Sequence, residues 1–288
     1  MFDDRLRIEI GRNVAAALAE DVGSGDLTAL LVSPHAQARA TVMTREAAVV
    51  CGAAWFDATF AAFSSSATVH WHVRDGDFAS PGQTLCDVFA PTRVLLTAER
   101  TALNFLQLLS ATATVTRRYV DAVAGTKARI VDTRKTLPGL RLAQKYAVRV
   151  GGGLNHRAGL YDGILIKENH IIAAGGVGKA VKAAQAISPP GVFIEVEVES
   201  INELQAALAA GAGMILLDNM SPDEMSEAVR ITAGRAVLEA SGGIGFENVR
   251  AIAATGVDSI SIGNLTKNVK ALDLSMRIMD DGHRGALS

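Results

Sequence analysis

Six short apolar runs in the second half of the chain each end in a polar residue, a charged residue or glycine. The runs occupy residues 129–134, 163–167, 194–199, 214–219, 237–241 and 259–263. Their ends are marked by Arg134, Lys167, Glu197, Asp218, Ser241 and Gly263, which lie 33, 30, 21, 23 and 22 residues apart. Each gap after the first two fits one helix and two loops between parallel neighbouring strands. The pattern predicts repeated strand and helix units with polar groups at the carboxyl ends of the strands, as in an α/β barrel.

The first third of the chain has a different pattern, which predicts a separate α+β domain. Apolar residues at Ile8, Ile10, Val14 and Leu18 predict a helix around 7–20. Short strands of mixed pattern are expected at 38–46, 47–52, 67–73 and 84–90, with turn segments between the last two.

The strand expected at 67–73 carries two histidines on one face. Alternation places Val69, Trp71 and Val73 on the other face, and His70 and His72 together. Two histidines can ligate a metal, but no third ligand lies nearby in the sequence. We favour the interpretation that both are polar residues on a solvated strand face.

Two further helices complete the expected organisation. Residues 97–120 predict a long helix that Thr97 can cap, and 269–279 predict an amphipathic helix that packs back on the first domain. We therefore expect an N-terminal α+β sandwich domain over 1–113, joined by a C-terminal helix over 270–288. The remaining residues, 114–269, are expected to form an open α/β barrel of about six or seven parallel strands.

Composition agrees with a cytoplasmic globular protein. A chain of 288 residues can bury a core that needs no disulfide or metal, so Cys51 and Cys86 are interpreted as buried thiols in a reducing compartment. The first residues carry acids and do not resemble a signal peptide. The longest apolar stretch, 47–63, is interrupted by Gly52 and Asp57, which argues against a membrane helix.

Charge is concentrated in one segment although the net charge is only −2. Residues 127–170 contain nine Lys or Arg and three acids, but only two aromatic residues, Tyr146 and Tyr161. Surfaces that bind nucleic acids usually combine basic residues with more aromatic ones. The segment therefore favours small anionic ligands over nucleic acid.

Eight segments, taken in order, resemble the quinolinate phosphoribosyltransferase family over nearly the whole chain. They are EDVGSGDLT, ERTALNFLQ, DTRKTLPGLR, KYAVRVGGGLNHRAGLYDGILIKENH, EVEVES, LLDNM, LEASGGI and ISIGNLTK. The resemblance implies transfer of the phosphoribosyl group of 5-phosphoribosyl 1-pyrophosphate (PRPP) to quinolinate. Decarboxylation accompanies the transfer and gives nicotinate mononucleotide, pyrophosphate and CO2 for NAD synthesis.

The resemblance also implies which residues bind quinolinate, a pyridine with two adjacent carboxylates. Such a diacid calls for several fixed cations, preferably arginine forks. The family's positions correspond here to Arg134, His156, Arg157 and Lys167, with Lys135 as a further active-site cation. Arg100 corresponds to an arginine that reaches into the neighbouring subunit's site, which implies a homodimer or a larger homo-oligomer.

PRPP requires a second set of residues. Its pyrophosphate travels with Mg²⁺, which prefers oxygen ligands and keeps several waters. The resemblance assigns Glu197 and Asp218 to Mg²⁺, directly or through water, and to the ribose hydroxyls. Glu195, Glu197 and Glu199 share one side of their strand, and spacing alone does not separate Glu197 from Glu199. The expected catalytic set is Lys135, Lys167, Glu197 and Asp218, and the proton donor after decarboxylation stays open between Lys135, Lys167 and water.

The loops after the last two strands predict a phosphate site, because glycines let backbone N–H groups approach an anion. These loops contain Ser241, Gly242, Gly243, Gly263 and Asn264. Residues 136–145 are expected to form a loop that orders over pyrophosphate. Two alternatives remain, namely a related phosphoribosyltransferase for another aromatic acid such as nicotinate, and a non-catalytic barrel that binds phosphorylated sugars.

Overall fold

The computed structural model describes residues 4–279, which fall into two compact units. The first unit comprises the chain up to Val115, the segment 138–151 and the chain from Val269 onward. The second comprises 116–137 and 152–268. The segment 138–151, which the sequence analysis assigned to the barrel domain, therefore belongs to the first unit.

The second unit is built on a sheet of six parallel strands, and every one of the six apolar runs forms one of them. The strands are β6 (Arg129–Val131), β7 (Ile164–Ile166), β8 (Ile194–Val198), β9 (Met214–Asp218), β10 (Val237–Ser241) and β11 (Ser259–Ser261). Their order in the sheet is β6-β11-β10-β9-β8-β7, with every pairing parallel. The predicted barrel of parallel strands is confirmed.

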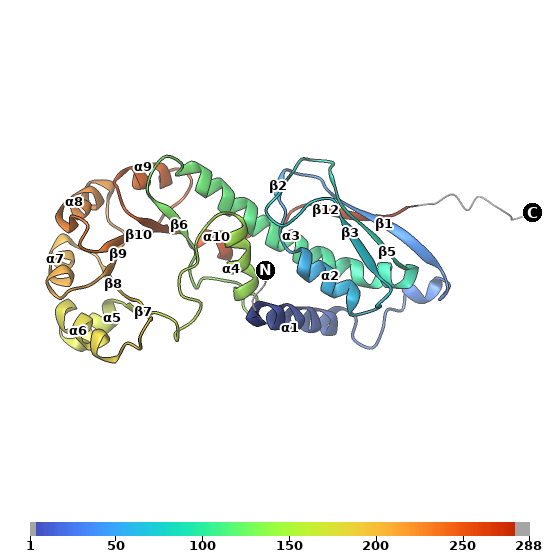
Figure 1. Ribbon diagram of the computed structural model, residues 1–288, viewed down its shortest axis with the longest axis horizontal. Helices are drawn as coiled ribbons and strands as arrows, with labels where there is room; N and C mark the ends of the chain where they lie inside the picture. The colour runs from blue at the N-terminus through green and yellow to red at the C-terminus, as the bar shows by residue number, and fades with distance from the viewer. Residues whose placement is uncertain (1–3, 280–288) are drawn as a thin grey trace, which may run out of the picture. The chain divides into compact units, whose positions relative to one another are not determined.

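Helices between the strands cover the outside of this sheet (Figure 1). They are α5 (Glu168–Ala174), α6 (Val177–Ile187), α7 (Ile201–Ala209), α8 (Pro222–Thr232), α9 (Val249–Ala254) and α10 (Asn264–Lys267). Local sequence explains where two of them begin. Ser200 caps α7 by accepting the N–H of Glu203, and Ser221 with Glu224 forms a capping box ahead of Pro222 in α8.

The open edge of the sheet, between β6 and β7, is spanned by the segment 152–163. Leu154 forms a parallel bridge with Val131, and its N–H donates to the carbonyl of Ile130. At the far end of the segment, the Arg157 guanidinium donates to the carbonyl of Gly163, just before β7, at 2.9 Å. This segment therefore takes the place of a further strand.

The first unit contains a four-stranded antiparallel sheet in the order β12-β1-β5-β3. Its strands are β1 (Gln37–Thr44), β3 (Thr68–Trp71), β5 (Thr84–Pro91) and β12 (Leu274–Ile278), beside a small pair, β2 (Ala48–Val49) and β4 (Phe78–Ala79). The helices are α1 (Asp4–Asp21), α2 (Ala53–Ala61), α3 (Thr92–Ala122), whose last residues belong to the second unit, and α4 (Arg141–Val150). A 3₁₀ turn covers Ala29–Leu31.

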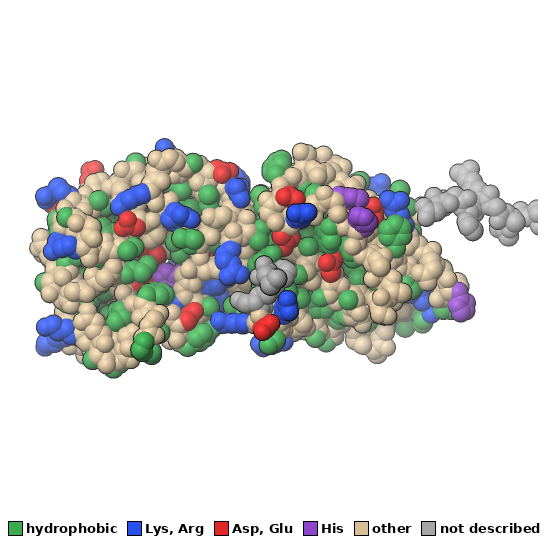
Figure 2. All heavy atoms as spheres, viewed as in Figure 1, with side chains coloured by type: hydrophobic (Ala, Val, Ile, Leu, Met, Phe, Trp, Pro, Cys, Tyr) green, Lys and Arg blue, Asp and Glu red, His purple; other side chains and the backbone are tan. Residues whose placement is uncertain are grey.

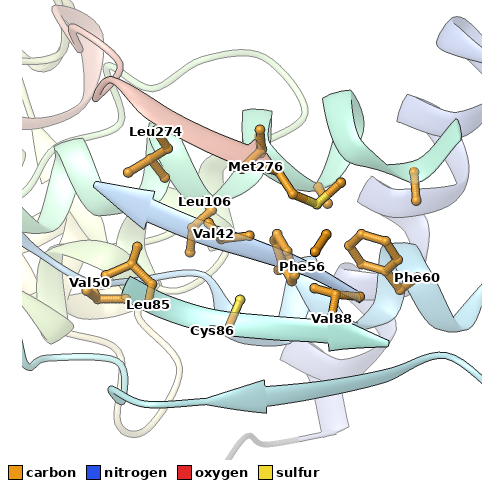
Figure 3. Close-up of a cluster of buried hydrophobic side chains, with 14 of the residues drawn as sticks. Val42, Val50, Phe56, Phe60, Leu85, Cys86, Val88, Leu106, Leu274 and Met276 are labelled. Atoms are coloured by element: carbon orange, nitrogen blue, oxygen red, sulfur yellow. The ribbon is translucent and has the colours of Figure 1, made fainter. Parts of the chain in front are cut away.

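The core of the first unit lies between the sheet and its helices. Figure 3 shows Val42 and Val88 from neighbouring strands directed toward Phe56 and Phe60 of α2. Phe56 packs edge-on against Trp71 at 5.3 Å between ring centroids. Both cysteines are buried free thiols, as predicted, and burial raises the pKa of each.

Two expectations about the first unit are wrong, and one of its helices was missed. The C-terminal segment forms the strand β12 at Leu274–Ile278, not a helix, because β1 offers it an antiparallel edge; residues 280–288 of the predicted helix lie outside the described residues. Thr97 does not cap α3. The helix starts at Thr92, and the Thr97 hydroxyl donates to the carbonyl of Arg93 and to Asp26. Helix α2 was not predicted.

The expected loop 136–145 is only partly a loop. Residues 141–145 form the first half of α4, in which Ala143, Gln144 and Lys145 are buried in the first unit. Asn13 of α1 donates to the carbonyl of Gly139 at 3.1 Å, which fixes the residues before the helix. The apolar spacing of α4 accounts for the difference, because it gives this segment a face to bury.

His70 of β3 and His72, which directly follows the strand, belong to a polar cluster on their sheet. His72 lies 2.9 Å from Asp87, and the rings of His70 and His72 stack 5.6 Å apart. Hydrogen bonds from Arg39 and Thr41 hold the pKa of Asp87 well below its usual range. His72 is thus anchored by a carboxylate of the neighbouring strand β5.

Charges of both signs are mixed on the face of the molecule that Figure 2 shows. Figure 2 shows Lys and Arg side chains interspersed with acidic and uncharged ones on the visible face of the described residues. Such mixing differs from the basic stripe of a nucleic-acid binding surface. Among residues 4–279, no helix combines the length and the apolar character needed to cross a membrane.

Candidate active site

A cavity of about 450 Å³ lies at the carboxyl ends of the barrel strands. Eight of the residues predicted from the sequence line it, namely Arg134, Lys135, His156, Arg157, Lys167, Glu197, Asp218 and Ser241. Six further lining residues were not predicted: Asp132, Thr133, Leu165, Leu216, Glu239 and Ser261. The strand ends therefore bring cations and carboxylates from five strands and one loop segment into a single cavity.

Two arginines place positive charge in the buried part of the cavity. Arg157 is only 9% exposed. Burial lowers the pKa of its guanidinium, and the charge of Arg134 lowers it further, against opposing effects of Asp162 and Glu195. Like charges in a desolvated site repel each other unless an anion lies between or beside them. The pair is suited to a ligand with more than one negative charge.

A lysine and two carboxylates form the next part of the site. The Lys167 ammonium donates to Glu197 at 2.6 Å. Burial raises the pKa of Asp218, and the charge of Glu197 raises it further, while Lys167 and Lys135 act in the opposite direction. Glu197 and Asp218 therefore repel each other across the ends of β8 and β9, which a bound cation would relieve.

Lys135 is positioned through its backbone. Its N–H donates to the hydroxyl of Thr133 at 3.0 Å, and its carbonyl accepts from the hydroxyl of Thr266 at 2.7 Å. Thr266 is fully buried in α10. The turn after β6 is thus held against the loop after β11, which fixes the point from which the Lys135 ammonium extends.

His156 is held from both sides of its ring. Its Nδ1 accepts the backbone N–H of Arg157 at 2.8 Å, so Nε2 carries the proton and donates to Glu195 at 2.7 Å. Below it, Asp132 is fully buried and accepts the N–H of His156 at 2.9 Å and the side-chain amide of Asn155 at 2.6 Å. Asp132 and Glu195 therefore fix the backbone and the ring of the segment that presents Arg157.

The three glutamates of β8 have different surroundings. Glu195 is fully buried beneath His156, Glu197 lines the cavity, and Glu199 is exposed beyond the strand. Its backbone N–H donates to Glu203, which belongs to the start of α7. The structure therefore distinguishes Glu197, which lines the cavity, from Glu199, which is exposed outside it. The spacing in the sequence did not distinguish them.

His156, Glu195 and Glu239 form the one group among the described residues whose donor atoms could surround a metal ion, with these atoms within 4.8 Å of one another. Both ring nitrogens of His156 already take part in hydrogen bonds within the protein. The imidazole thus offers no lone pair to a metal in this arrangement. Glu197 and Asp218, which also line the cavity, are carboxylates of the kind that a hard cation prefers.

A second cavity, of about 290 Å³, lies beside the first and shares Thr133, Lys135, Ser241 and Ser261 with it. The predicted phosphate-loop residues Gly242, Gly243, Gly263 and Asn264 line it. The Asn248 side chain fixes this loop by accepting the N–H of Gly245 and donating to the carbonyl of Gly243. Glycine backbone in such a loop can approach a phosphate closely.

Gly242 is the loop position least tolerant of a side chain. Its φ is +92°, and a Cβ there would lie 2.1 Å from Asn219 Oδ1 and 2.8 Å from the Asn219 backbone nitrogen. We expect Gly242→Ala to displace the loop and raise the KM for a phosphorylated substrate by about tenfold or more. Gly243→Ala is the matched control, because its φ of +57° also strains alanine but nothing lies within 4 Å of its Cβ. Steady-state kinetics measure both, and equal effects would contradict this role of Gly242.

Arg100 is the one predicted site residue that lies in the first unit. It is exposed on α3. Sequence reasoning missed several lining residues, above all Asp132 and Glu239. One feature of the sequence could have indicated that these two are functional. Each is an acid within or directly after an apolar run, where burial demands a partner.

Fold and cavities together define an α/β-barrel protein with a charged cavity and a glycine-lined cavity at the carboxyl ends of its strands. Residues 26–110 match the N-terminal domain of quinolinate phosphoribosyl transferase, and residues 112–277 match its C-terminal domain.

Curated and structural relatives agree with these domain matches. The chain is 51% identical over 211 residues to a nicotinate-nucleotide pyrophosphorylase (carboxylating) of Mycobacterium leprae, covering 72% of this chain and 74% of that protein. It is 40% identical over 282 residues to a quinolinate phosphoribosyltransferase (decarboxylating) of Nicotiana glauca, covering 91% and 80%. The solved nicotinate-nucleotide pyrophosphorylase of Francisella tularensis superimposes with a TM-score of 0.91 at 44% identity, covering 94% of this chain and 96% of that one. The chain belongs to the quinolinate phosphoribosyltransferase family.

Proposed function

We propose that this protein transfers the phosphoribosyl group of PRPP to the ring nitrogen of quinolinate and releases CO2, pyrophosphate and nicotinate mononucleotide. The observation that carries this proposal is one cavity that combines the guanidinium groups of buried Arg157 and half-buried Arg134 with two carboxylates at neighbouring strand ends. Arg134 and Arg157 grip the two carboxylates of quinolinate, with Lys167 close by. Glu197 and Asp218 face the ribose and the pyrophosphate of PRPP.

Orientation and electrostatics supply most of the catalysis in this scheme. The 5′-phosphate lies on the backbone of the glycine loops, which leaves C1′ in the larger cavity beside the clamped pyridine. As the bond from C1′ to the pyrophosphate oxygen breaks, positive charge develops on the ribose, and Glu197 and Asp218 stabilise it. The ring nitrogen attacks C1′, and Lys135 and Lys167 stabilise the departing anion.

Decarboxylation follows from the charge of the ring. Once its nitrogen is bonded to C1′, the pyridinium stabilises the electron pair left on the adjacent carbon when CO2 departs. A proton then replaces the lost carboxylate. The protein holds the departing carboxylate in a desolvated position, and no nucleophilic side chain is required.

Mg²⁺ is part of the proposal. Glu197 and Asp218 fit such an ion, because both are carboxylates and their mutual repulsion contributes to the raised pKa of Asp218. When bound, Mg²⁺ would neutralise charge on the pyrophosphate and so favour its departure. Lys167 donates to Glu197 and the Asn219 side chain donates to Asp218, so the protein itself orients both carboxylates.

An assay of the purified protein tests the function. Quinolinate, PRPP and Mg²⁺ are supplied together, and nicotinate mononucleotide and CO2 are followed, with nicotinate as an alternative substrate and a sample without metal. We expect product from quinolinate only. Turnover of nicotinate alone would overturn the assignment of the arginines, and no turnover of either acid would favour a binding protein.

We further propose that the active form is a homodimer or larger homo-oligomer in which Arg100 completes the site of a neighbouring subunit. The family resemblance of ERTALNFLQ supports this role. The exposure of Arg100 on α3 is compatible with it.

Mixing two inactive variants tests this proposal. Arg100→Ala and Lys167→Ala are each expected to lose most activity, because each removes a cation from every site. After the subunits are exchanged, half of the dimers carry both changes on different chains, and each such dimer has one complete site. Activity should therefore return to about a quarter of the wild-type value. Mixtures as inactive as the separate variants would contradict an Arg100 that acts across the interface.

A further inference from the structure

A buried glutamate forms part of the cavity wall and has no role in the reaction described above. Glu239 lies in the middle of β10, paired with Leu216 of β9 and Ser259 of β11, and is only 1% exposed. It nevertheless lines the larger cavity together with Arg134 and Arg157. Serines of β11 are the hydrogen-bond donors to its carboxyl, and the Ser259 hydroxyl donates at a long 3.4 Å.

A second buried carboxyl lies beside it. Glu195 is fully buried on β8, and its oxygens lie within 4.8 Å of the donor atoms of Glu239 and His156. One Glu195 oxygen accepts from His156, while the other has no hydrogen-bond partner among the described residues. Two buried carboxylates at this separation cannot both remain ionised without large repulsion. A single proton on the pair removes that repulsion.

The surroundings of Glu239 determine where this proton resides. Burial and the charge of Glu195 raise the pKa of Glu239 to about 7, whereas His156, Ser261 and Ser259 lower it by smaller amounts. The facing groups are Glu195 on β8, His156 on the segment 152–163, and the two serines on β11; the β9 neighbour, Leu216, is apolar. Glu195 is already engaged by His156, so the proton belongs to Glu239.

We propose that Glu239 is a specificity-determining residue that binds substrate as a carboxylic acid, donating a hydrogen bond to one carboxylate of the bound diacid. The inference rests on the proposed function, because it requires an anionic acid beside Arg134 and Arg157. A neutral acid donates to a carboxylate, whereas an ionised one repels it. Glu239 thus contributes a donor without adding a further fixed positive charge to a site whose arginines already repel each other.

Proton linkage gives this proposal a signature that a purely structural role lacks. A bound anion disfavours ionisation of Glu239, so its pKa is higher in the complex than in the free protein. Binding therefore takes up protons once the pH exceeds about 7. Above that pH, the affinity for the diacid falls by up to about tenfold per pH unit.

Calorimetric titration of the intact protein with quinolinate alone, between about pH 6 and pH 8.5, tests the inference. Buffers with different ionisation enthalpies report the protons taken up. The wild type should show the loss of affinity and the proton uptake above about pH 7. Glu239→Gln keeps an N–H donor, so its affinity near pH 6 should lie within about threefold of the wild type, with the pH dependence greatly reduced.

Two further variants isolate the hydrogen bond. Glu239→Leu has no donor and should bind at least about tenfold more weakly near pH 6, without recovering at any pH. Glu227→Gln removes one negative charge from an exposed position on α8 and should leave the wild-type pH dependence intact. Thermal unfolding identifies any variant that fails to fold. If either Glu239→Gln or Glu239→Leu fails to fold, the other variant still tests the proposal.

The outcomes separate this inference from the proposed function. If the wild type turns over quinolinate but its binding shows no proton uptake, or if Glu239→Gln keeps the full pH dependence, only the role of Glu239 is overturned. If quinolinate neither binds nor reacts, both are overturned.

Discussion

Arg134→Ala is expected to raise the KM for quinolinate by about 10- to 100-fold, with a much smaller change for PRPP. Arg134 lines the cavity beside Arg157, and each guanidinium can form two charge-assisted hydrogen bonds to one carboxylate. Losing a hydrogen-bonded charge of this kind costs about 1.5–3 kcal/mol. Steady-state kinetics with each substrate varied in turn measure the effect.

Arg129→Ala is the matched control for this experiment. Arg129 begins the same strand, β6, and is exposed, so the substitution removes the same charge from the opposite end of the strand. It should leave both KM values within about twofold of the wild type. An equal rise in both KM values for Arg134→Ala would contradict its assignment to quinolinate.

Glu197→Gln and Asp218→Asn are each expected to lower kcat by about 10²- to 10³-fold. Both carboxylates would stabilise positive charge that develops on the ribose, and removal of one such electrostatic contact from a desolvated site commonly has an effect of this size. Glu197→Gln also takes away the ionic partner of Lys167. The concentration of Mg²⁺ needed for half-maximal rate should rise in both variants.

Glu199→Gln provides the control for the glutamate on β8. Its side chain is exposed beyond the end of the strand, two residues from Glu197. It should keep nearly full activity, which would establish that the position on the strand decides the effect. A loss of kcat in Glu199→Gln as large as in Glu197→Gln would show that the ribose and metal contacts are assigned to the wrong glutamate.

Parallel strands could be predicted here because each one is short, apolar and followed at once by a polar residue. Burial on both faces makes such strands continuous apolar runs, which stand out in a sequence. The residues at their ends then had to lie on one face of the barrel, which brought Arg134, Lys167 and Asp218 together. Arg157 and the choice of Glu197 over Glu199 came from the family resemblance instead.

The errors arose where a distant partner decided the structure. Leu272, Leu274 and Met276 alternate with period two, as a strand requires, but β12 forms only because β1 presents an edge more than two hundred residues earlier in the chain. Helix α3 begins directly after Pro91, and a proline at this point is a local signal for the start of a helix. The prediction followed the apolar spacing from Leu103 onward instead and placed the start at Thr97. Glu239 was missed because its partners come from β8 and β11, which only the folded sheet places together.

The segment that spans the open edge of the sheet also links the stability of the barrel to its ligand. Leu154 completes the sheet beside β6, and three residues later Arg157 enters the cavity. Fraying of this edge would therefore dismantle the substrate site in the same event. A diacid held by Arg157 would bind only the form in which this edge is intact. Local opening of the barrel edge would therefore become rarer as the concentration of the diacid rises.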